Sequence, residues 1–450
     1  MTSPLQALAG HCGLPKTADA VVVGGGIIGL LASIELKQAH RSVVLIEAAR
    51  VGCAQSRRHI GFIREQGRTS AETELMRLSQ QMWSELADLV GPDLGWFRGG
   101  HLSLSCEDTN RANAPIGAWG DVAKRAGIPF EELSAAEITE RHPWLSPRYT
   151  YAGFTPADAQ LDPNLSLDAL VHHARSMGVN VIERVAANSL VLRGDRVVGV
   201  STGRGDISTP VVILATGAWT RRLLRHHGVT LPTHCGVATI AATKPVPPLT
   251  RHTVWEIGKL GFRQDQRGRL VFAFGGYARV HLRWEDILAG PRLLPTYLRS
   301  WRTIRLRITR DLWRDIWAVI RRHPLESLSW SEHPPNHAEV KQGLEQLALM
   351  VPSLRDHLTL DEAWSGVIDA TADELPAIGD GGIRGLSFAA GLSGHGIGIA
   401  PAVARALTEI ASTGETTVPD VAELSPERLR GYKPYPGRRR RARTVTKMTT

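Results

Sequence analysis

Short apolar runs that end in glycine-rich turns recur along the chain and predict buried strands. The first spans 18–23, the second ends at Glu47 in RSVVLIEA, a third runs into ILATGAW, and a fourth ends at Ala390. Such nearly continuous runs are typical of parallel strands that are buried on both faces. Helical patterns follow the first and the last run, over 27–37 and from about Ile399.

Two other segments predict neighbouring strands joined by tight turns. Residues 181–199 indicate two or three strands with a Gly-Asp turn, and residues 261–277 indicate a hairpin with an Arg-Gly turn. Strand-forming residues on both sides of such a dipeptide are the short-range signal of a hairpin.

Three glycines after the first run, Gly24, Gly26 and Gly29, match the pattern G-x-G-x-x-G. Gly24 permits the tight turn out of the strand, Gly26 lets the backbone approach a pyrophosphate, and Gly29 lets the helix pack against the sheet. The pattern alone is weak, but here the strand, the helix, the second strand and a terminal acid all fall in place. We therefore predict a dinucleotide site, against the alternative of a glycine turn without a ligand.

The predicted helix and the acid supply the polar contacts of this site. Because the helix begins near Ile27, the N–H groups of Ile27 and Ile28 and the positive end of the dipole face the phosphates. Glu47 stands 18 residues after Gly29 and can accept hydrogen bonds from both ribose hydroxyls of an adenosine. Its charge would repel a 2′-phosphate, which disfavours NADP.

The composition fits an ordinary globular protein of about two domains. The chain has 450 residues, 43% of them hydrophobic, and a net charge of +9. We find no nucleic-acid motif, no apolar stretch long enough for a bilayer and no secretory signal, so we expect a cytoplasmic protein. Four scattered cysteines without CxxC spacing argue against a metal site or a disulfide framework: Cys12, Cys53, Cys106 and Cys235.

Several motifs, in order along the chain, resemble those of the D-amino-acid-oxidase-type family of FAD-dependent amine oxidoreductases, and most of all its sarcosine oxidase β-subunit branch. The number and order of the motifs carry this resemblance, and GLSGHGIG discriminates best. The motifs are Gly24–Gly29 with Glu47, RVGCAQSRRHIGFIR (50–64), ILATGAW (213–219), DELPAIGD (373–380) and GLSGHGIGIAP (391–401).

The resemblance implies an α/β fold with two domains. One is a Rossmann-like FAD-binding domain whose parallel sheet is assembled from discontinuous segments, and the other is an α+β substrate domain with an antiparallel sheet. We expect the FAD-binding domain over 18–88, 145–225 and 355–430, and the substrate domain over 89–144 and 226–354 with a basic helical insert at 290–322. A flexible N-terminus (1–17) and a basic disordered tail (431–450) complete the chain.

The resemblance also implies which residues contact FAD. The second glycine loop would lie under the flavin pyrimidine ring, where N–H groups and a helix dipole stabilise the anion of the reduced flavin. Val185 would meet the adenine, unless it is plain strand core, and Gly217 and Trp219 would line the adenosine side. The segment after Glu47 would pass over the pyrophosphate. The further contacts implied are Gly52, Ser56, Arg57 and Arg58 in that segment, and Gly391, Gly394, His395, Gly396 and Ile397 in the second loop.

Three residues are candidates for the substrate side. Arg64 aligns with an arginine that holds the substrate carboxylate in sarcosine-oxidising relatives, and a planar guanidinium binds a carboxylate bidentately. A surface position or an FAD-phosphate contact stays open for it. Arg263 is the second carboxylate candidate, against a solvated strand arginine. His59, where relatives usually have asparagine, either contacts the flavin, acts in the site or is a core histidine; we expect His395 to be structural.

Two departures from the family pattern bear on the cofactor. Gly366 stands where relatives with covalent FAD carry a cysteine, which indicates non-covalent FAD. Gly398 stands where monomeric sarcosine oxidases carry a lysine that speeds oxygen reduction. The electron acceptor, O2 or a quinone, therefore stays open. The missing lysine favours a dehydrogenase over a fast oxidase.

These observations predict an FAD-dependent amine or amino-acid oxidase or dehydrogenase that acts on CH–NH donors. A hydride would pass from the carbon beside the nitrogen to flavin N5, and the resulting imine would hydrolyse. One rival is an FAD-binding subunit that is active only with a partner. Another is an NAD-dependent reductase, which would be colourless.

The arginine-rich segment 292–322 lies outside the family pattern. Apolar residues recur in steps of three or four from Leu294 to Ile320, with arginines between them, and predict one amphipathic helix. Three interpretations stay open: the apolar face packs on the substrate domain, lies on a membrane interface, or docks a partner subunit.

Overall fold

A six-stranded sheet contains all the runs predicted as parallel strands. The computed structural model describes residues 13–106, 115–275, 278–284, 286–287, 304–321 and 333–437, and the single positions 290 and 298. The strand order is β21-β22-β13-β1-β2-β9, and only β21 runs antiparallel to its neighbour. The strands are β1 (Ala20–Val23), β2 (Val43–Glu47), β9 (Asn180–Glu183), β13 (Val212–Leu214), β21 (Ala377–Gly379) and β22 (Leu386–Ala390).

Both faces of this sheet are covered, which explains why its inner strands β1, β13 and β22 are almost entirely apolar, whereas the edge strand β9 contains Asn180 and Glu183. Ala20 and Val22 of β1 belong to a core that they share with helices α1 (Ile27–Gln38), α2 (Ser70–Val90), α5 (Pro163–Ser176) and α10 (Gly396–Thr413). Val21 and Val23 belong to the opposite core. That core also includes residues of α6 (Thr220–His226) and of a small sheet of β10 (Ala187–Arg193), β11 (Arg196–Thr202) and β12 (Gly205–Ser208).

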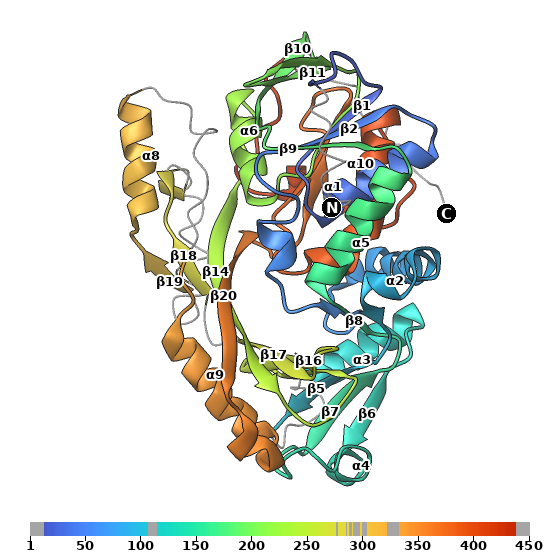
Figure 1. Cartoon of the computed structure of the whole chain (residues 1–450), viewed down its shortest axis with the longest axis vertical. Coiled ribbons are helices and arrows are strands. Elements are labelled where there is room, and N and C mark those ends of the chain that lie inside the picture. Colours follow the sequence, from blue (N-terminus) through green and yellow to red (C-terminus); the bar gives the residue numbers. More distant parts are fainter. Residues whose placement is uncertain are drawn as a thin grey trace, which may run out of the picture.

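A second, mixed sheet of ten strands forms the other half of the molecule (Figure 1). Its long antiparallel pair, β14 (Thr233–Pro245) and β20 (Leu360–Thr371), runs from this half toward the first sheet. The other strands are β5 (His101–Ser105), β6 (Glu131–Ser134), β7 (Tyr151–Thr155), β15 (Thr253–Glu256), β16 (Leu260–Gln264), β17 (Arg269–Phe274), β18 (Ala278–His281) and β19 (Ile304–Arg307).

The remaining elements surround these sheets. A three-stranded sheet contains β3 (Phe62–Ile63), β8 (Ala159–Leu161) and β4 (Trp96–Phe97). The other α-helices described are α3 (Pro115–Ala126), α4 (Ala135–Arg141), α8 (Arg310–Ile320) and α9 (His337–Met350). None of the helices within the described ranges is long and apolar enough to cross a bilayer.

Both predicted turns are confirmed, with one change of partner. Gly268 joins β16 to β17 with a positive φ of 79°, and Gly194 joins β10 to β11 with a φ of 63°. The first strand of segment 181–199, β9, pairs with β2 in the parallel sheet instead of with β10. The sequence predicted the strands and the Gly-Asp turn but not the partner of β9, because partner choice depends on residues far away in the sequence.

The expected domain boundaries divide the second sheet. The boundaries at 145 and 355 assign β7 and β20 to the FAD-binding domain, but both strands hydrogen-bond in the ten-stranded sheet. The two-domain division remains a prediction. The chain ends also differ from expectation within the described residues: Thr17 bridges to Ser208, and Lys433 pairs with Thr230. Residues 1–12 and 438–450 lie outside the described part.

The prediction of one helix over 292–322 was wrong. Residues 304–307 form β19, which pairs in parallel with β18, and α8 begins only at Arg310. The alternation Ile-Arg-Leu-Arg fits a strand as well as a helix, and the open edge beside β18 decides between them. Residues 291–297, 299–303 and 322 lie outside the described part.

Candidate functional site

The first glycine loop is packed so closely that side chains are excluded. Gly24 has a φ of +106°, and a Cβ there would lie 2.5 Å from the carbonyl oxygen of Ala215. A Cβ on Gly29 would lie 1.9 Å from the carbonyl oxygen of Gly24. Only glycine fits both positions, and so α1 begins directly against the ends of β1 and β13.

The N-terminus of α1 faces the segment that follows β2. The helix begins at Ile27, as predicted, and the N–H group of Ile27 donates to Ser56 Oγ at 3.0 Å. Gly26 caps the helix without a side chain, and a Cβ there would lie 3.0 Å from the same oxygen. An oxygen acceptor already sits at this positive end, and a phosphate suits the same end.

Glu47 organises the turn at the end of β2. One carboxylate oxygen accepts from the N–H of Gly25 at 2.7 Å, and the other accepts from the N–H of Ala49 at 2.8 Å. Its carbonyl oxygen accepts from the N–H of Val185, which is buried. The two residues expected beside the adenosine are therefore direct neighbours, although Val185 also fits its alternative reading as core.

Gln55 connects three distant segments. Its Oε1 accepts from the N–H of Ala218 at 3.0 Å, and its Nε2 donates to Asp369 at 2.9 Å. The other carboxylate oxygen of Asp369 accepts from the N–H of Gly391 at 2.5 Å. A Cβ on Gly217 would lie 2.0 Å from Gln55 Oε1. Sequence reasoning missed Gln55 and Asp369, because a single amide and a single acid within strand and loop patterns give no signal.

The second glycine loop leads into α10, which begins at Gly396 and not near Ile399. Gly391 and Gly394 have φ values of +63° and +80°. A Cβ on Gly391 would lie 2.6 Å from the side chain of Thr371. The helix starts early because the left-handed turn at Gly394 already reverses the chain.

Helix α2 supports the start of α10 through buried side chains. Ser79 and Trp83 donate to the carbonyl oxygens of Gly398 and Ile397 at 2.6 and 3.1 Å. His395 Nδ1 lies 3.4 Å from a carboxylate oxygen of the buried Glu72. Burial, and then the nearby Arg68, lower the pKa of His395 to about 4, so the ring is neutral at pH 7.

Ser56 lies at the start of α1, but the two arginines expected at the pyrophosphate contact other protein groups. Arg57 forms an ion pair with Asp168 of α5 at 2.5 Å. Arg58 donates to the carbonyl oxygens of Cys53 and Ser365 at 3.3 and 3.2 Å. The structure thus commits Arg57 to a carboxylate on a neighbouring helix, which sequence spacing could not show.

Arg64 is half-buried and lies in a cationic cluster. Its Nη1 donates to the carbonyl oxygen of Gln66 at 2.7 Å, and its guanidinium lies 4.8 Å from the ring centre of Trp255. Burial, and then Arg68, lower the pKa of Arg64 to about 9, so it stays charged at pH 7. Arg68, which sequence reasoning missed, is 6% exposed, and its Nη1 has no hydrogen-bond acceptor among the described residues.

Asp158 is the buried acid near these arginines. It accepts from the N–H of Glu65 at 2.6 Å and from Gln80 at 3.3 Å. Burial raises the pKa of Asp158 to about 8, against the lowering effect of hydrogen bonds and of Arg64. The second buried acid beside both arginines is Glu72; burial would raise its pKa, but a hydrogen bond from His395 and the arginines lower it. Two arginines against this one carboxylate leave a surplus of positive charge, which suits an anionic group.

Arg263 contacts the loop around His59 through part of its guanidinium. Its Nε donates to the carbonyl oxygen of Ile60 at 2.6 Å, and its Nη2 lies 3.6 Å from Asp162. Both ring nitrogens of His59 are buried and lack a hydrogen-bond partner among the described residues. Burial, and then Arg263, lower the pKa of His59 to about 4. The role of Arg263 as a second carboxylate candidate stays a prediction, and these contacts show that part of its guanidinium already serves the loop.

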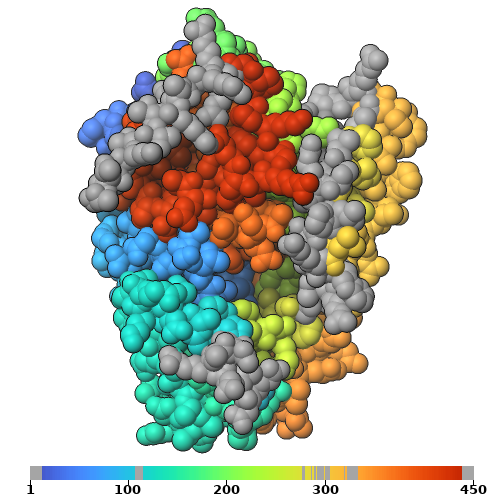
Figure 2. All heavy atoms as spheres, turned by 180° about the vertical axis from the view of Figure 1, so that it is seen from behind, coloured from blue at the N-terminus to red at the C-terminus, as the bar shows by residue number. Residues whose placement is uncertain are grey.

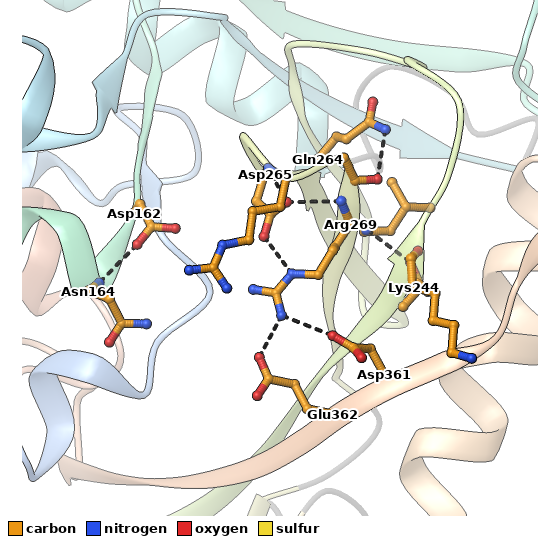
Figure 3. A network of polar contacts seen from close by, with 12 residues as sticks. Asp162, Asn164, Lys244, Gln264, Asp265, Arg269, Asp361 and Glu362 are labelled. Carbon is orange, nitrogen blue, oxygen red and sulfur yellow. Dashed lines mark hydrogen bonds and ion pairs between the residues drawn. The ribbon is translucent and has the colours of Figure 1, made fainter.

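The hairpin that carries Arg263 is fixed to β20 by another arginine (Figure 3). Arg269 pairs with Asp265 within the hairpin at 2.9 Å, and with Asp361 and Glu362 of β20 at 3.2 and 2.7 Å. These ion pairs raise the pKa of Arg269, whose burial alone would lower it. These ion pairs therefore fix the position of the hairpin, which contacts the loop at His59.

The two glycines that depart from the family pattern are both tightly packed. A Cβ on Gly366 would lie 2.9 Å from the carbonyl oxygen of Arg58. A Cβ on Gly398 would lie 3.1 Å from the sulfur of Met76 and 3.4 Å from a guanidinium nitrogen of Arg68. Arg68 thus adjoins the start of α10 from the side where a lysine would project.

The chain belongs to the DAO family of FAD-dependent oxidoreductases. The family model, described as "FAD dependent oxidoreductase", matches residues 19–410. This match confirms the predicted family and FAD as the cofactor. Solved structures confirm the fold: an L-amino acid deaminase from Proteus vulgaris has a TM-score of 0.85 at 24% identity, covering 93% of this chain and 99% of that one. An L-proline dehydrogenase from P. horikoshii has a TM-score of 0.75 at 23% identity, covering 92% and 98%.

Curated relatives include two oxidases and a dehydrogenase. A 4-methylaminobutanoate oxidase (formaldehyde-forming) from Paenarthrobacter nicotinovorans is 33% identical over 58% of this chain and 32% of its own length. The mitochondrial sarcosine dehydrogenase of Mus musculus is 28% identical over 61% of this chain and 30% of its own length. Glycine oxidase from Pseudomonas aeruginosa is 26% identical over 90% and 98%. The alignments with the first two span about a third of those relatives' length.

Proposed function

We propose that this protein oxidises a C–N bond of a small amine or amino acid that carries a carboxylate. One observation supports this most directly: the half-buried Arg64 and the buried Arg68 lie beside the start of α10, which follows the second glycine loop. The named relatives act on glycine, sarcosine or 4-methylaminobutanoate, and each of these molecules combines an amine with a carboxylate.

The cradle of glycines fits FAD. Gly24, Gly26 and Gly29 leave the end of α1 open to a phosphate, with Ser56 beside it. Glu47 presents its carboxylate at the adenosine end, and the loop from Gly391 presents backbone N–H groups at the flavin end. When bound, FAD supplies the oxidising power: it takes up two electrons and the hydrogen of the broken C–H bond.

We propose that FAD is held without a covalent bond at β20. A side chain at Gly366 would overlap the backbone of Arg58, so a cysteine there would require the loop to move. Gly398 in place of a lysine favours a dehydrogenase that passes electrons to a quinone, with O2 as the other acceptor.

The protein residues bind and orient the substrate. Arg64, stacked on Trp255, and Arg68 bind the carboxylate, and the pKa of Arg64, about 9, keeps its guanidinium charged at pH 7. His59 is neutral and offers a ring nitrogen to the substrate amine or to the cofactor. The amine must lose its proton before it reacts, and water then hydrolyses the imine to a carbonyl compound and an amine.

Anaerobic mixing tests the proposal. The FAD-loaded protein should lose its yellow absorbance with an N-methyl amino acid or with a D- or L-amino acid, faster as pH rises toward the pKa of the amine. An amine of the same length without a carboxylate is the matched control and should react much more slowly. If no substrate bleaches the flavin, the proposal fails. The rival, an FAD-binding subunit, then predicts bleaching only after a co-purified partner is added.

A further inference from the structure

Helix α8 turns its acids inward. Asp315 accepts from Arg283 at 2.7 Å and from Arg222 of α6 at 3.1 Å, and all three side chains are at most 1% exposed. Asp311, 2% exposed, lies 3.7 Å from Arg283. These buried ion pairs fix the helix to the part of the molecule that contains α6, so its orientation is determined by contacts and not by its own amphipathic pattern.

The outward face of α8 carries a ridge of three apolar side chains. Trp313, Trp317 and Ile320 recur at steps of four and three, and their exposed fractions are 58%, 56% and 70%. Residues at this spacing lie on one face of a helix. Ile308, just before the helix, is 68% exposed. Large apolar residues that project together from a monomer surface mark a contact site.

Every exposed charge in the described segment 304–321 is positive. Within residues 304–321 the exposed charged side chains are all arginines, because both acids of this segment are buried: Arg305, Arg307, Arg310, Arg314 and Arg321. The guanidinium of Arg321 lies 4.7 Å from the ring centre of Trp317. The ridge therefore combines tryptophans with a uniform positive charge.

The position of α8 leaves this ridge accessible. The helix lies at the periphery of the molecule, away from α1 and α10, and β19 beside it is an edge strand of the large sheet (Figure 1). From behind, the same segment projects at one side of the molecule (Figure 2).

We propose that α8 and β19 dock this protein on an anionic phospholipid surface. Trp and Ile would enter the region between headgroups and acyl chains, and the arginines would contact lipid phosphates, as in helices that lie flat on membranes. Lipid is favoured over a protein partner because the apolar part is a narrow ridge of single side chains, whereas a stable protein interface buries roughly 800 Å² on each partner with a broad apolar centre.

Vesicle sedimentation of the full, FAD-loaded chain tests this proposal. The protein should sediment with vesicles of equal parts phosphatidylglycerol and phosphatidylcholine, and much less with phosphatidylcholine alone. The double variant Trp313→Ser/Trp317→Ser should bind anionic vesicles with an affinity at least about tenfold lower than that of the wild type. The double variant Arg310→Glu/Arg321→Glu should lose the preference for anionic lipid. Added salt should weaken the binding of the wild-type protein to anionic vesicles.

Matched controls separate this surface from general stickiness. Leu89→Ser/Leu349→Ser removes two apolar side chains that are 60% and 47% exposed on α2 and α9, and it should bind like the wild type. Flavin absorbance and thermal unfolding should be unchanged in all variants, since only exposed side chains change. Wild-type protein that stays in the supernatant with both vesicle types would overturn the proposal. So would a tryptophan variant that sediments like the control, or one whose only defect is loss of self-association in gel filtration.

Discussion

Gln55 Nε2 lies 2.9 Å from Asp369 Oδ1, although 314 residues separate them. Asp369 in turn holds the N–H of Gly391, and Gln55 holds the N–H of Ala218. The pair thus sets the distance between the segment at the first glycine loop and the start of the second. Two helix N-termini can act on one cofactor only if this distance is fixed.

Breaking this link should weaken FAD binding. We expect Asp369→Ala to lower the affinity for FAD about tenfold to a hundredfold, because the buried N–H of Gly391 and the half-buried amide of Gln55 lose their acceptor at a cost of about 1–3 kcal/mol. Titration of FAD into the stripped protein, followed by fluorescence quenching, measures this. Asp361→Ala, at the far and exposed end of the same strand, is the control and should change little. Equal affinities of the two variants would show that Asp369 does not organise the loops.

A side chain at Gly26 should block the cofactor without unfolding the chain. The one neighbour of a Cβ at this position is Ser56 Oγ at 3.0 Å, at the end of α1. We expect Gly26→Val to purify colourless with normal circular dichroism. Gly203→Val places the same side chain where a Cβ meets nothing within 4 Å, and it should stay yellow. Full flavin content in Gly26→Val would contradict the assigned phosphate position.

Arg64 should contribute to recognition of the carboxylate. Replacing it with leucine removes a charge-assisted contact of about 2–3 kcal/mol, so we expect KM for an amino-acid substrate to rise about 30- to 150-fold. The matched amine without a carboxylate should react equally with both proteins. A similar loss for both substrates in steady-state kinetics would point to a purely structural role for Arg64.

Protonation of His59 should make the protein less stable in acid. Its pKa is about 4 in the folded protein and 6.5 without the fold. Between these values the unfolded chain binds a proton that the folded protein does not bind, so stability falls as pH drops through this window. When the pH falls from about 7 to about 4.5, the free energy of unfolding should drop by about 2 kcal/mol less in His59→Gln than in the wild type. Urea unfolding at both pH values measures this difference.

The control for this pH experiment is His172→Gln, which changes an exposed histidine on α5. It should follow the wild-type pH dependence. If His59→Gln follows it too, His59 titrates in the folded protein as it does in the unfolded chain, and its ring is not shielded.

The ion pairs beneath α8 should be stability determinants. Asp315→Ala leaves Arg222 and Arg283 buried without their shared carboxylate, and we expect a loss of about 3–5 kcal/mol in the free energy of unfolding. Asp168→Ala breaks the exposed pair with Arg57 and should cost less than about 1 kcal/mol. Comparable losses in denaturant unfolding would mean that the arginines under α8 reach water.

The sequence by itself determined the local units of this protein. The apolar runs, the glycines and Glu47 predicted the strand–glycine–helix units, because steric exclusion at Gly24 and Gly29 and the burial of both sheet faces are imposed by neighbouring residues. The order of these units was enough to identify the family and its cofactor.

Only the tertiary structure decided what the isolated polar residues do. Arg57, Arg64 and Arg263 look alike in the sequence, but one pairs with Asp168, one stacks on Trp255 and one holds Ile60. In the same way, α8 turns its acids inward and its tryptophans outward because its ion-pair partners come from segments far away in the sequence. Local periodicity carries no information about which distant charge will fill a buried position, and that charge determines the orientation.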